Sequence, residues 1–180
     1  MIMPRIFVVM GVAGSGKSTV AAALADADAG AGVGADGACY LDADDFHPAA
    51  NVEKMRSGVP LTDDDRWPWL DDFADALAAT AKKTTVYGAC SALRRAYRDR
   101  ITARAGMAVT FLHLDGPAAL IAGRMAAREG HFMPESLLKS QFATLEPIAP
   151  DEDAIVVDIS GDAEAIVADI RAQMNRSAAG

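Results

Sequence analysis

The sequence Gly11-Val-Ala-Gly-Ser-Gly-Lys17-Ser18 follows directly on the apolar run Ile6–Met10. It fits the pattern G-x-x-x-x-G-K-[ST], in which a glycine-rich turn joins a strand to a helix. Backbone N–H groups of such a turn face bound phosphates, so bulky side chains are not tolerated at Gly11 or Gly16. The complete match disfavours a turn that binds nothing. We therefore predict an ATP- or GTP-binding loop made of Gly11, Val12, Ala13, Gly14, Ser15, Gly16, Lys17 and Ser18.

Within this loop, Lys17 is expected to neutralise the β- and γ-phosphates, and the Ser18 hydroxyl is expected to bind Mg²⁺. Asp42 and Asp44 follow the next predicted strand. Being two residues apart on an extended chain, they point the same way and can reach one site. One carboxylate can order Mg²⁺ and its waters, while the other accepts a hydroxyl proton. The alternative is a solvated acidic turn, which the neighbouring phosphate loop disfavours.

Short apolar runs alternate with longer stretches of helical period, as in a parallel sheet covered by helices on both faces. The runs are continuously apolar, which is typical of strands buried on both sides. The five predicted strands are Ile6–Met10, Cys39–Leu41, Thr85–Ala89, Val109–Leu114 and Ile155–Val157. We therefore expect an α/β fold in a single domain.

Helical periodicity predicts helices over Leu70–Ala81 and Leu93–Ile101, and a last helix from about Asp162, a suitable N-cap. The segment Gly130–Pro150 is interpreted as a helical insertion bounded by prolines, and as a candidate mobile lid. The Gly- and Ala-rich segment Ala29–Ala38 predicts a flexible surface loop.

The chain has 180 residues, of which 51% are hydrophobic and 23% charged, a globular composition that excludes wholesale disorder. Its net charge of −8 repels polyanions, so general nucleic-acid binding is not expected. The apolar run after Arg5 is too short to span a membrane. Cys39 and Cys90 can form at most one bridge, and we interpret them as reduced thiols of a soluble, cytoplasmic protein.

Charge is unevenly distributed: acidic residues concentrate between residues 36 and 75, and arginines between 84 and 131. A guanidinium group can bind a carboxylate or phosphate bidentately. The candidate clamps are Arg94, Arg95, Arg98, Arg124 and Arg128. Arg124 and Arg128 lie one helical turn apart before the predicted lid, and this pair is expected to cover the nucleotide. His47, after the acidic pair, is a candidate hydroxyl ligand, with a capping role as the alternative.

Taken together, these motifs resemble those of the small P-loop gluconate kinases. The matching blocks are Gly11–Ser18, Asp42–Asp44 with His47-Pro48, Asn51–Gly58 with Pro60-Leu61, Asp63–Arg66 with Pro68–Leu70, Cys90–Leu93 with Tyr97–Asp99, and Gly130–Pro134 with Ser140–Phe142. They follow the family's order from Gly11 to about Glu152, and as a set they are highly specific.

The resemblance implies ATP-dependent phosphorylation of D-gluconate at its 6-hydroxyl, with Mg²⁺ as cofactor. It also implies a fold like those of nucleoside monophosphate kinases and shikimate kinase: a five-stranded parallel sheet with flanking helices and a helical lid. The family further suggests a homodimer.

The resemblance also assigns individual roles. Asp42 resembles the carboxylate that holds Mg²⁺ through water, and Asp44 resembles the one that engages the acceptor hydroxyl. The residues that would contact gluconate are Arg66 and Arg98, with His47 and Ser91 as further polar contacts. Arg124 and Arg128 match the lid-side arginines.

Three alternatives remain. A kinase of the same architecture with another acceptor, such as shikimate or a nucleoside monophosphate, would share the phosphate loop, but the blocks Asp63–Leu70 and Cys90–Asp99 favour gluconate. The stretch Asp158-Ile-Ser-Gly161 reads D-x-x-G, as in nucleotide-dependent switches, yet it lies near the C-terminus without an N-K-x-D signature. A fold used only as an interaction module is disfavoured, because Lys17 and Asp44 are both intact.

Overall fold

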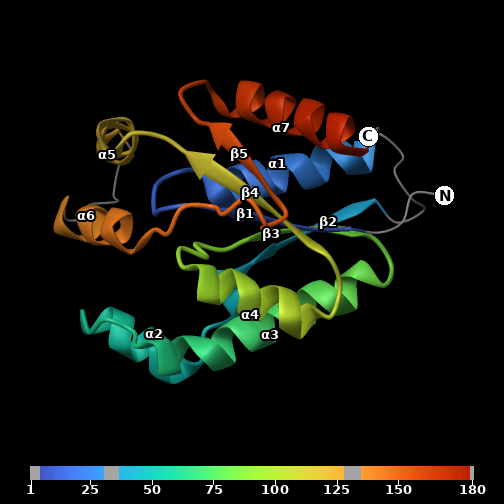
Figure 1. The fold of residues 1–180 in the computed structure, drawn as a ribbon. Coiled ribbons are helices and arrows are strands. Elements are labelled where there is room, and N and C mark those ends of the chain that lie inside the picture. Colours follow the sequence, from blue (N-terminus) through green and yellow to red (C-terminus); the bar gives the residue numbers. More distant parts are fainter. Residues whose placement is uncertain (1–4, 31–36, 128–134, 179–180) are drawn as a thin grey trace.

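The computed structural model of the chain describes residues 5–30, 37–127 and 135–178. Its centre is a parallel sheet in the order β2-β3-β1-β4-β5 (Figure 1). The strands are β1 (Ile6–Met10), β2 (Ala38–Asp42), β3 (Thr85–Ala89), β4 (Val109–Asp115) and β5 (Ala154–Asp158). Each contains one of the five predicted strands, so the predicted α/β class is confirmed. Because β1 is central, the loop that follows it lies between the carboxyl ends of β3 and β4.

Helices cover both faces of the sheet. In the described residues they are α1 (Lys17–Gly30), α2 (Ala49–Arg56), α3 (Asp63–Ala81), α4 (Arg95–Ala105), α5 (Ala118–Ala126), α6 (Glu135–Thr144) and α7 (Ala163–Ala178), with a short 3-10 helix η1 (Ala43–Phe46). Figure 1 shows α1 and α7 on one face and α3 and α4 on the other. Among these described helices, none combines the length and apolar character that crossing a membrane requires.

A hydrophobic core lies on each side of the sheet. The side chains of β1 alternate between them: Ile6 and Val8 pack with residues of α3 and α4, whereas Phe7 and Val9 pack with residues of α1 and α7. All of β1 is buried, which explains why its sequence is continuously apolar.

Helix α3 begins at Asp63, one and a half to two turns before the predicted start at Leu70, because its first turn is polar but strongly capped. The Asp65 N–H donates to Thr62 Oγ1, and the Thr62 N–H donates to the Asp65 carboxylate, forming a capping box. Hydrogen bonds from Lys54 and Thr62 lower the pKa of Asp65 to about 2. At α7 the predicted N-cap is confirmed, since the Ala165 N–H donates to Asp162 Oδ1.

Two predicted segments fall partly outside the described residues. In the predicted loop Ala29–Ala38, residues 31–36 lie outside the described residues. Of the rest, Ala29 and Gly30 belong to the end of α1, and Ala38 is the first residue of β2. Of the predicted lid, residues 130–134 lie outside as well. Its later part is docked on the domain: Leu138 of α6 is buried, and the Glu146 N–H donates to the Leu93 carbonyl at 2.8 Å.

Candidate active site

The phosphate loop bridges the end of β1 and the first turn of α1, as its sequence predicts. Gly11 has a φ of +148°, and a Cβ there would lie 2.9 Å from Ser15 Oγ and 3.0 Å from the Leu114 carbonyl oxygen. Gly16 has a φ of +95°, which L side chains rarely adopt. Both positions therefore require glycine for the backbone path of the loop.

Lys17 lies at the start of α1, and its Nζ donates to the carbonyl of Val12 within the same loop at 3.1 Å. Burial lowers the pKa of Lys17, while Cys90, Asp44 and Asp42 act in the opposite direction. An ammonium group with few competing waters attracts phosphate more strongly than one in bulk solvent.

Asp42, the last residue of β2, lies against the start of α1. Its Oδ2 accepts from Ser18 Oγ and from the Tyr40 hydroxyl, each at 2.7 Å, and its Oδ1 accepts from the Asp44 N–H at 3.0 Å. Burial acts to raise the pKa of Asp42, but these hydrogen bonds and Lys17 together hold it below its ordinary value.

The paired oxygens of Ser18 and Asp42 fit Mg²⁺, which prefers oxygen ligands and keeps several waters when bound beside phosphates. No group of three or more His, Cys, Asp or Glu side chains that could hold a metal occurs within residues 5–30, 37–127 and 135–178. The donors present therefore suit an ion held chiefly by a nucleotide rather than by a protein cage.

An open cavity of about 270 Å³ lies at the carboxyl ends of β2 and β3. It is lined by Ala13, Gly14, Lys17, Ser18, Asp42, Asp44, Ala89, Cys90, Ser91 and Gln141. The structure thus brings together seven predicted site residues from three separate stretches of chain: Ala13, Gly14, Lys17, Ser18, Asp42, Asp44 and Ser91. Desolvation at the cavity wall and the adjacent Asp42 carboxylate raise the pKa of Asp44.

His47 lies beside this cavity, with its ring stacked on Trp69 at a centroid distance of 4.2 Å. The amide of Asn51 donates to the Asp65 carbonyl, so its Nδ2 faces His47 Nδ1 at 3.4 Å as a donor. Nδ1 is then the acceptor, and the proton of the neutral ring is on Nε2, 3.8 Å from Asp44 Oδ1. Burial and the charge of Arg66 lower the pKa of His47, which favours this neutral form.

Arg66 of α3 and Arg94, just before α4, converge on one carboxylate. Arg66 Nη1 lies 3.2 Å from Asp63 Oδ1, and Arg94 Nη1 lies 3.1 Å from Asp63 Oδ2. Tyr97 donates its hydroxyl to Asp63, and both guanidinium groups lie over its ring. The two arginines remain partly exposed, with 28% and 44% of their side-chain surface accessible, so a further anion can reach them.

Arg98, predicted to contact gluconate, has a different environment. Its side chain is 1% exposed and forms a bidentate ion pair with Glu152, with the Arg98 Nε to Glu152 Oε2 distance at 2.5 Å. Its remaining donors are used by the carbonyls of Ala92, Leu93 and Pro147. Arg98 thus joins the loop after β3 to the segment before β5 with its donors in use, whereas Arg94 is partly exposed.

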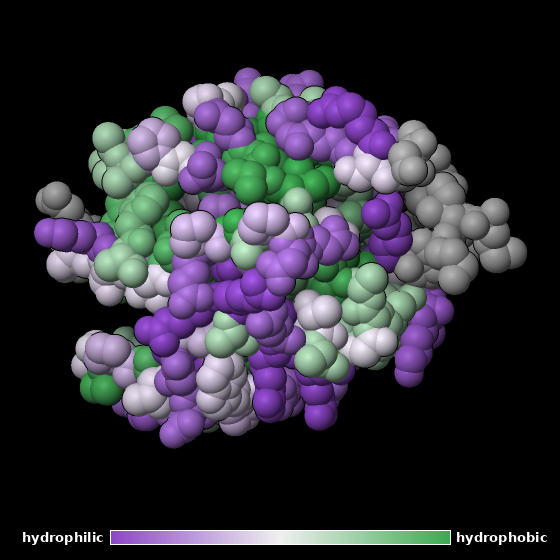
Figure 2. Space-filling model, viewed as in Figure 1, coloured by the Kyte–Doolittle hydropathy of each residue, from purple (hydrophilic) through white to green (hydrophobic). Residues whose placement is uncertain are grey.

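Two arginines of α4 pair with the acidic stretch of the chain. Arg100 binds Asp71 and Arg104 binds Asp75 across α3 and α4, at 2.6 and 2.7 Å. Figure 2 shows the resulting polar surface over these two helices. Arg95 similarly forms a bidentate pair with Asp151. Part of the uneven charge distribution in the sequence is therefore resolved by ion pairs between α3 and α4.

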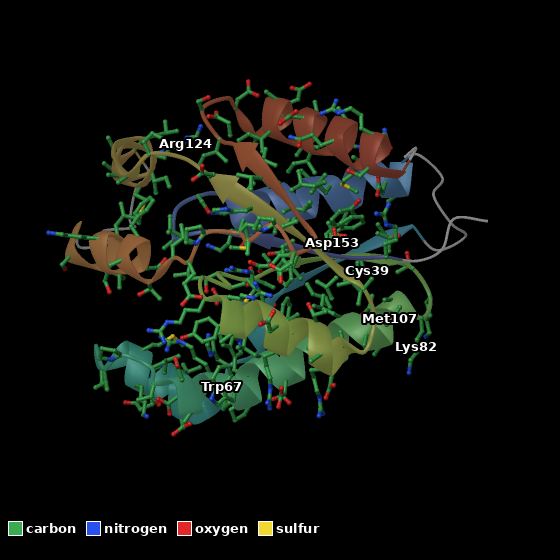
Figure 3. The ribbon with its side chains drawn as sticks, viewed as in Figure 1. Cys39, Trp67, Lys82, Met107, Arg124 and Asp153 are labelled. Atoms are coloured by element: carbon green, nitrogen blue, oxygen red, sulfur yellow. The ribbon has the colours of Figure 1, made fainter. Side chains whose placement is uncertain are left out.

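Arg124 extends from α5 toward the turn between β5 and α7 (Figure 3), where its Nη2 donates to the Gly161 carbonyl at 2.7 Å. It lines a second cavity of about 180 Å³, together with Ser15, Gly16 and Thr19 of the phosphate loop and α1. Arg124 therefore lies close to the phosphate loop, and its contact with a nucleotide stays a prediction. Its predicted partner Arg128 is outside the described residues.

Gln141 of α6 was not predicted as a site residue. Its Oε1 accepts from the backbone N–H of Ala13, inside the phosphate loop, at 2.6 Å. The sequence did offer a signal, because Gln141 is a polar residue at helical spacing among the apolar residues Leu138, Phe142 and Leu145.

The glycine loop after a central parallel strand, its lysine and the adjoining Ser18–Asp42 pair define a P-loop kinase domain. The AAA domain family model matches residues 6–148. The gluconokinase of Gluconobacter oxydans is 45% identical over 161 residues, which cover 88% of this chain and 83% of that protein. This chain belongs to the gluconokinase family.

Comparison of structures agrees. A gluconokinase from Sinorhizobium meliloti superposes with a TM-score of 0.83 at 40% identity, covering 98% of this chain and 94% of that one. The shikimate kinase of Aquifex aeolicus, at 15% identity and a TM-score of 0.57 over 98% of this chain and 99% of that one, shares the fold alone. The expected likeness to shikimate kinase in architecture is confirmed.

Proposed function

We propose that this protein transfers the γ-phosphoryl group of ATP to the 6-hydroxyl of D-gluconate, giving 6-phosphogluconate and ADP. The observation that carries the proposal is the cavity in which Lys17 and Ser18 of the phosphate loop face Asp44. A nucleotide held by the loop would present its γ-phosphate toward this carboxylate. The gluconokinase relatives identify the acceptor class.

On the nucleotide side, the loop N–H groups and Lys17 bind the β- and γ-phosphates, and Arg124 lies near the other end of the nucleotide. Ser18 and Asp42 hold Mg²⁺, which supplies charge neutralisation for the phosphates when bound. The ionised state of Asp42, supported by its three hydrogen bonds, suits this role.

On the acceptor side, Asp44 orients the 6-hydroxyl and accepts its proton as the new O–P bond forms and the bond between the γ-phosphorus and the ADP oxygen breaks. The raised pKa of Asp44 favours its action as a base. The His47 ring lies close to this carboxylate, with Nε2 3.8 Å from Asp44 Oδ1.

The carboxylate and hydroxyl groups of gluconate are bound by Arg66 and Arg94, with Ser91 as a further polar contact. The proposal keeps Arg66 from the sequence prediction and replaces Arg98 by Arg94. Its support is the accessibility of the two guanidinium groups that converge on Asp63, and their match to a carboxylate.

The test is ADP release by purified protein with Mg·ATP and one acceptor at a time: D-gluconate, shikimate, AMP, CMP or none, with product mass determined. We expect ADP release that depends on gluconate, with one phosphate added to it, and a phosphorus–proton NMR correlation that places the phosphate on carbon 6. Activity with only another acceptor would overturn the substrate assignment and leave the nucleotide site standing.

The homodimer and cytoplasmic location implied by the family resemblance are part of the proposal. Sedimentation equilibrium at several protein concentrations tests the first, and fractionation of the source cells tests the second. A single monomeric species throughout would contradict the dimer.

A further inference from the structure

The contact between Gln141 and the phosphate loop joins segments far apart in the chain. The Ala13 N–H belongs to the loop whose amides face the phosphates, and it donates to Gln141 Oε1 at 2.6 Å. Since Ala13 supplies a hydrogen, the amide oxygen must face it. The orientation of the Gln141 amide is therefore fixed by chemistry, and its NH₂ group is directed away from Ala13.

The position of Gln141 is fixed by the packing of α6. Leu138, Phe142 and Leu145 pack against the core that also contains Val12 of the phosphate loop. Leu138 and Phe142 lie three residues before and one after Gln141, so these three share one face of α6, and Leu145 directly follows the helix end. The Gln141 side chain consequently extends toward the protein rather than toward solvent.

The end of α6 is tied down as well. Next to the contact between Glu146 N–H and the Leu93 carbonyl, the Arg95 N–H donates to Glu146 Oε2 at 2.6 Å. These bonds connect α6 to the segment after β3, which carries Ser91 into the active-site cavity. The Gln141 amide is thus held directly by the phosphate loop, and the chain that follows it is held by the segment after β3.

Gln141 lines the cavity together with Lys17, Ser18 and Asp44. Its NH₂ group has no hydrogen-bond acceptor among the residues that the structure describes. An oriented amide donor in a site built for a transferring phosphoryl group can stabilise the negative charge on its oxygens.

We propose that Gln141 is a phosphoryl-contacting residue: its Oε1 is held by the Ala13 N–H, and its NH₂ group donates to a γ-phosphate oxygen of ATP. Helix α6 thereby contributes directly to the site. The inference rests on the proposed kinase function, but on its nucleotide half alone, and it does not depend on which acceptor is used.

The test compares the binding of Mg·ADP and of a non-hydrolysable ATP analogue, by calorimetry without acceptor, in Gln141→Ala and Gln141→Glu variants. Loss of one hydrogen bond to a charged group predicts about tenfold weaker analogue binding in Gln141→Ala, with ADP binding unchanged. Gln141→Glu keeps an acceptor for the Ala13 N–H but replaces the donor by a negative charge, so it should weaken analogue binding at least as much.

Ser140→Ala is the matched control, since Ser140 is exposed on the same helix, and it should leave both affinities unchanged. Circular dichroism melting establishes that each variant is folded. Equal weakening of ADP and analogue would reduce Gln141 to a support of the loop, and no change in either would remove it from the site. Absence of gluconate-dependent turnover in the unmodified protein would instead contradict the proposal that gluconate is the acceptor. The binding measurements would remain interpretable, because they are made without acceptor.

Discussion

The two halves of the proposed active site are built in different ways. The nucleotide half comes mainly from one contiguous stretch, Gly11–Ser18, and works largely through backbone N–H groups placed by glycines. The acceptor half is assembled from side chains of η1, α3 and the start of α4, held by ion pairs and stacking. A local pattern therefore specifies the first half, whereas the second depends on tertiary packing.

The largest effect is expected from Lys17→Met in the nucleotide half. A cation on the transferring phosphoryl group is worth about 10³- to 10⁵-fold in kcat in P-loop enzymes, so a loss of about 10³-fold or more is expected. Steady-state kinetics measures it, with the exposed Lys83→Met as control. Turnover within tenfold of the unmodified protein would show that Lys17 does not act on the phosphates.

Arg98→Met should affect folding rather than gluconate binding. Removing one partner of a buried ion pair leaves Glu152 charged and unpaired, at a cost of about 3–5 kcal/mol in the free energy of unfolding. Urea unfolding measures this loss, and the double variant Arg98→Met/Glu152→Met should recover part of it.

The control is Arg104→Met, which breaks the exposed pair with Asp75 and should cost at most about 1 kcal/mol. Unchanged stability of Arg98→Met with a raised KM for gluconate would restore Arg98 to the role first predicted for it.

Arg66→Met and Arg94→Met should separate the two halves kinetically. Each removes a charge-assisted contact to the acceptor, so KM for gluconate is expected to rise about 10- to 100-fold. KM for ATP should stay the same. Arg100→Met, which disrupts a surface pair between α4 and α3, is the control. A comparable rise in KM for ATP would place these arginines on the nucleotide instead.

The smallest effect concerns pH and His47. Because the pKa of His47 is below 6.5 in the folded protein, the unfolded chain binds the proton more readily. Its contribution to stability is present above pH 6.5 and is lost as the pH falls toward the folded pKa. Between about pH 7.5 and 5.5, His47→Gln should therefore lose less stability than the unmodified protein, as measured by urea unfolding. A steeper loss of stability in His47→Gln than in the unmodified protein would mean that folding raises the pKa of His47.

What could be predicted from the sequence follows the same division. Buried parallel strands are continuously apolar and the phosphate loop is a local motif, so both could be located from the sequence alone. The start of α3 was missed because its capping box lies in an acidic run. The roles of Arg94 and Arg98 depend on Asp63 and Glu152, which lie 31 and 54 residues away in sequence, and no local pattern reveals such pairing.

The two halves meet at Asp44, which makes one variant decisive. In Asp44→Asn, the nucleotide half is intact and the base is lost, so gluconate-dependent turnover should fall about 10²- to 10⁴-fold while affinity for the ATP analogue stays within about threefold. Measuring both quantities on the same preparation tests the division directly. Unchanged turnover would contradict the role of Asp44 in phosphoryl transfer, and a parallel loss of nucleotide affinity would contradict the separation of the two halves.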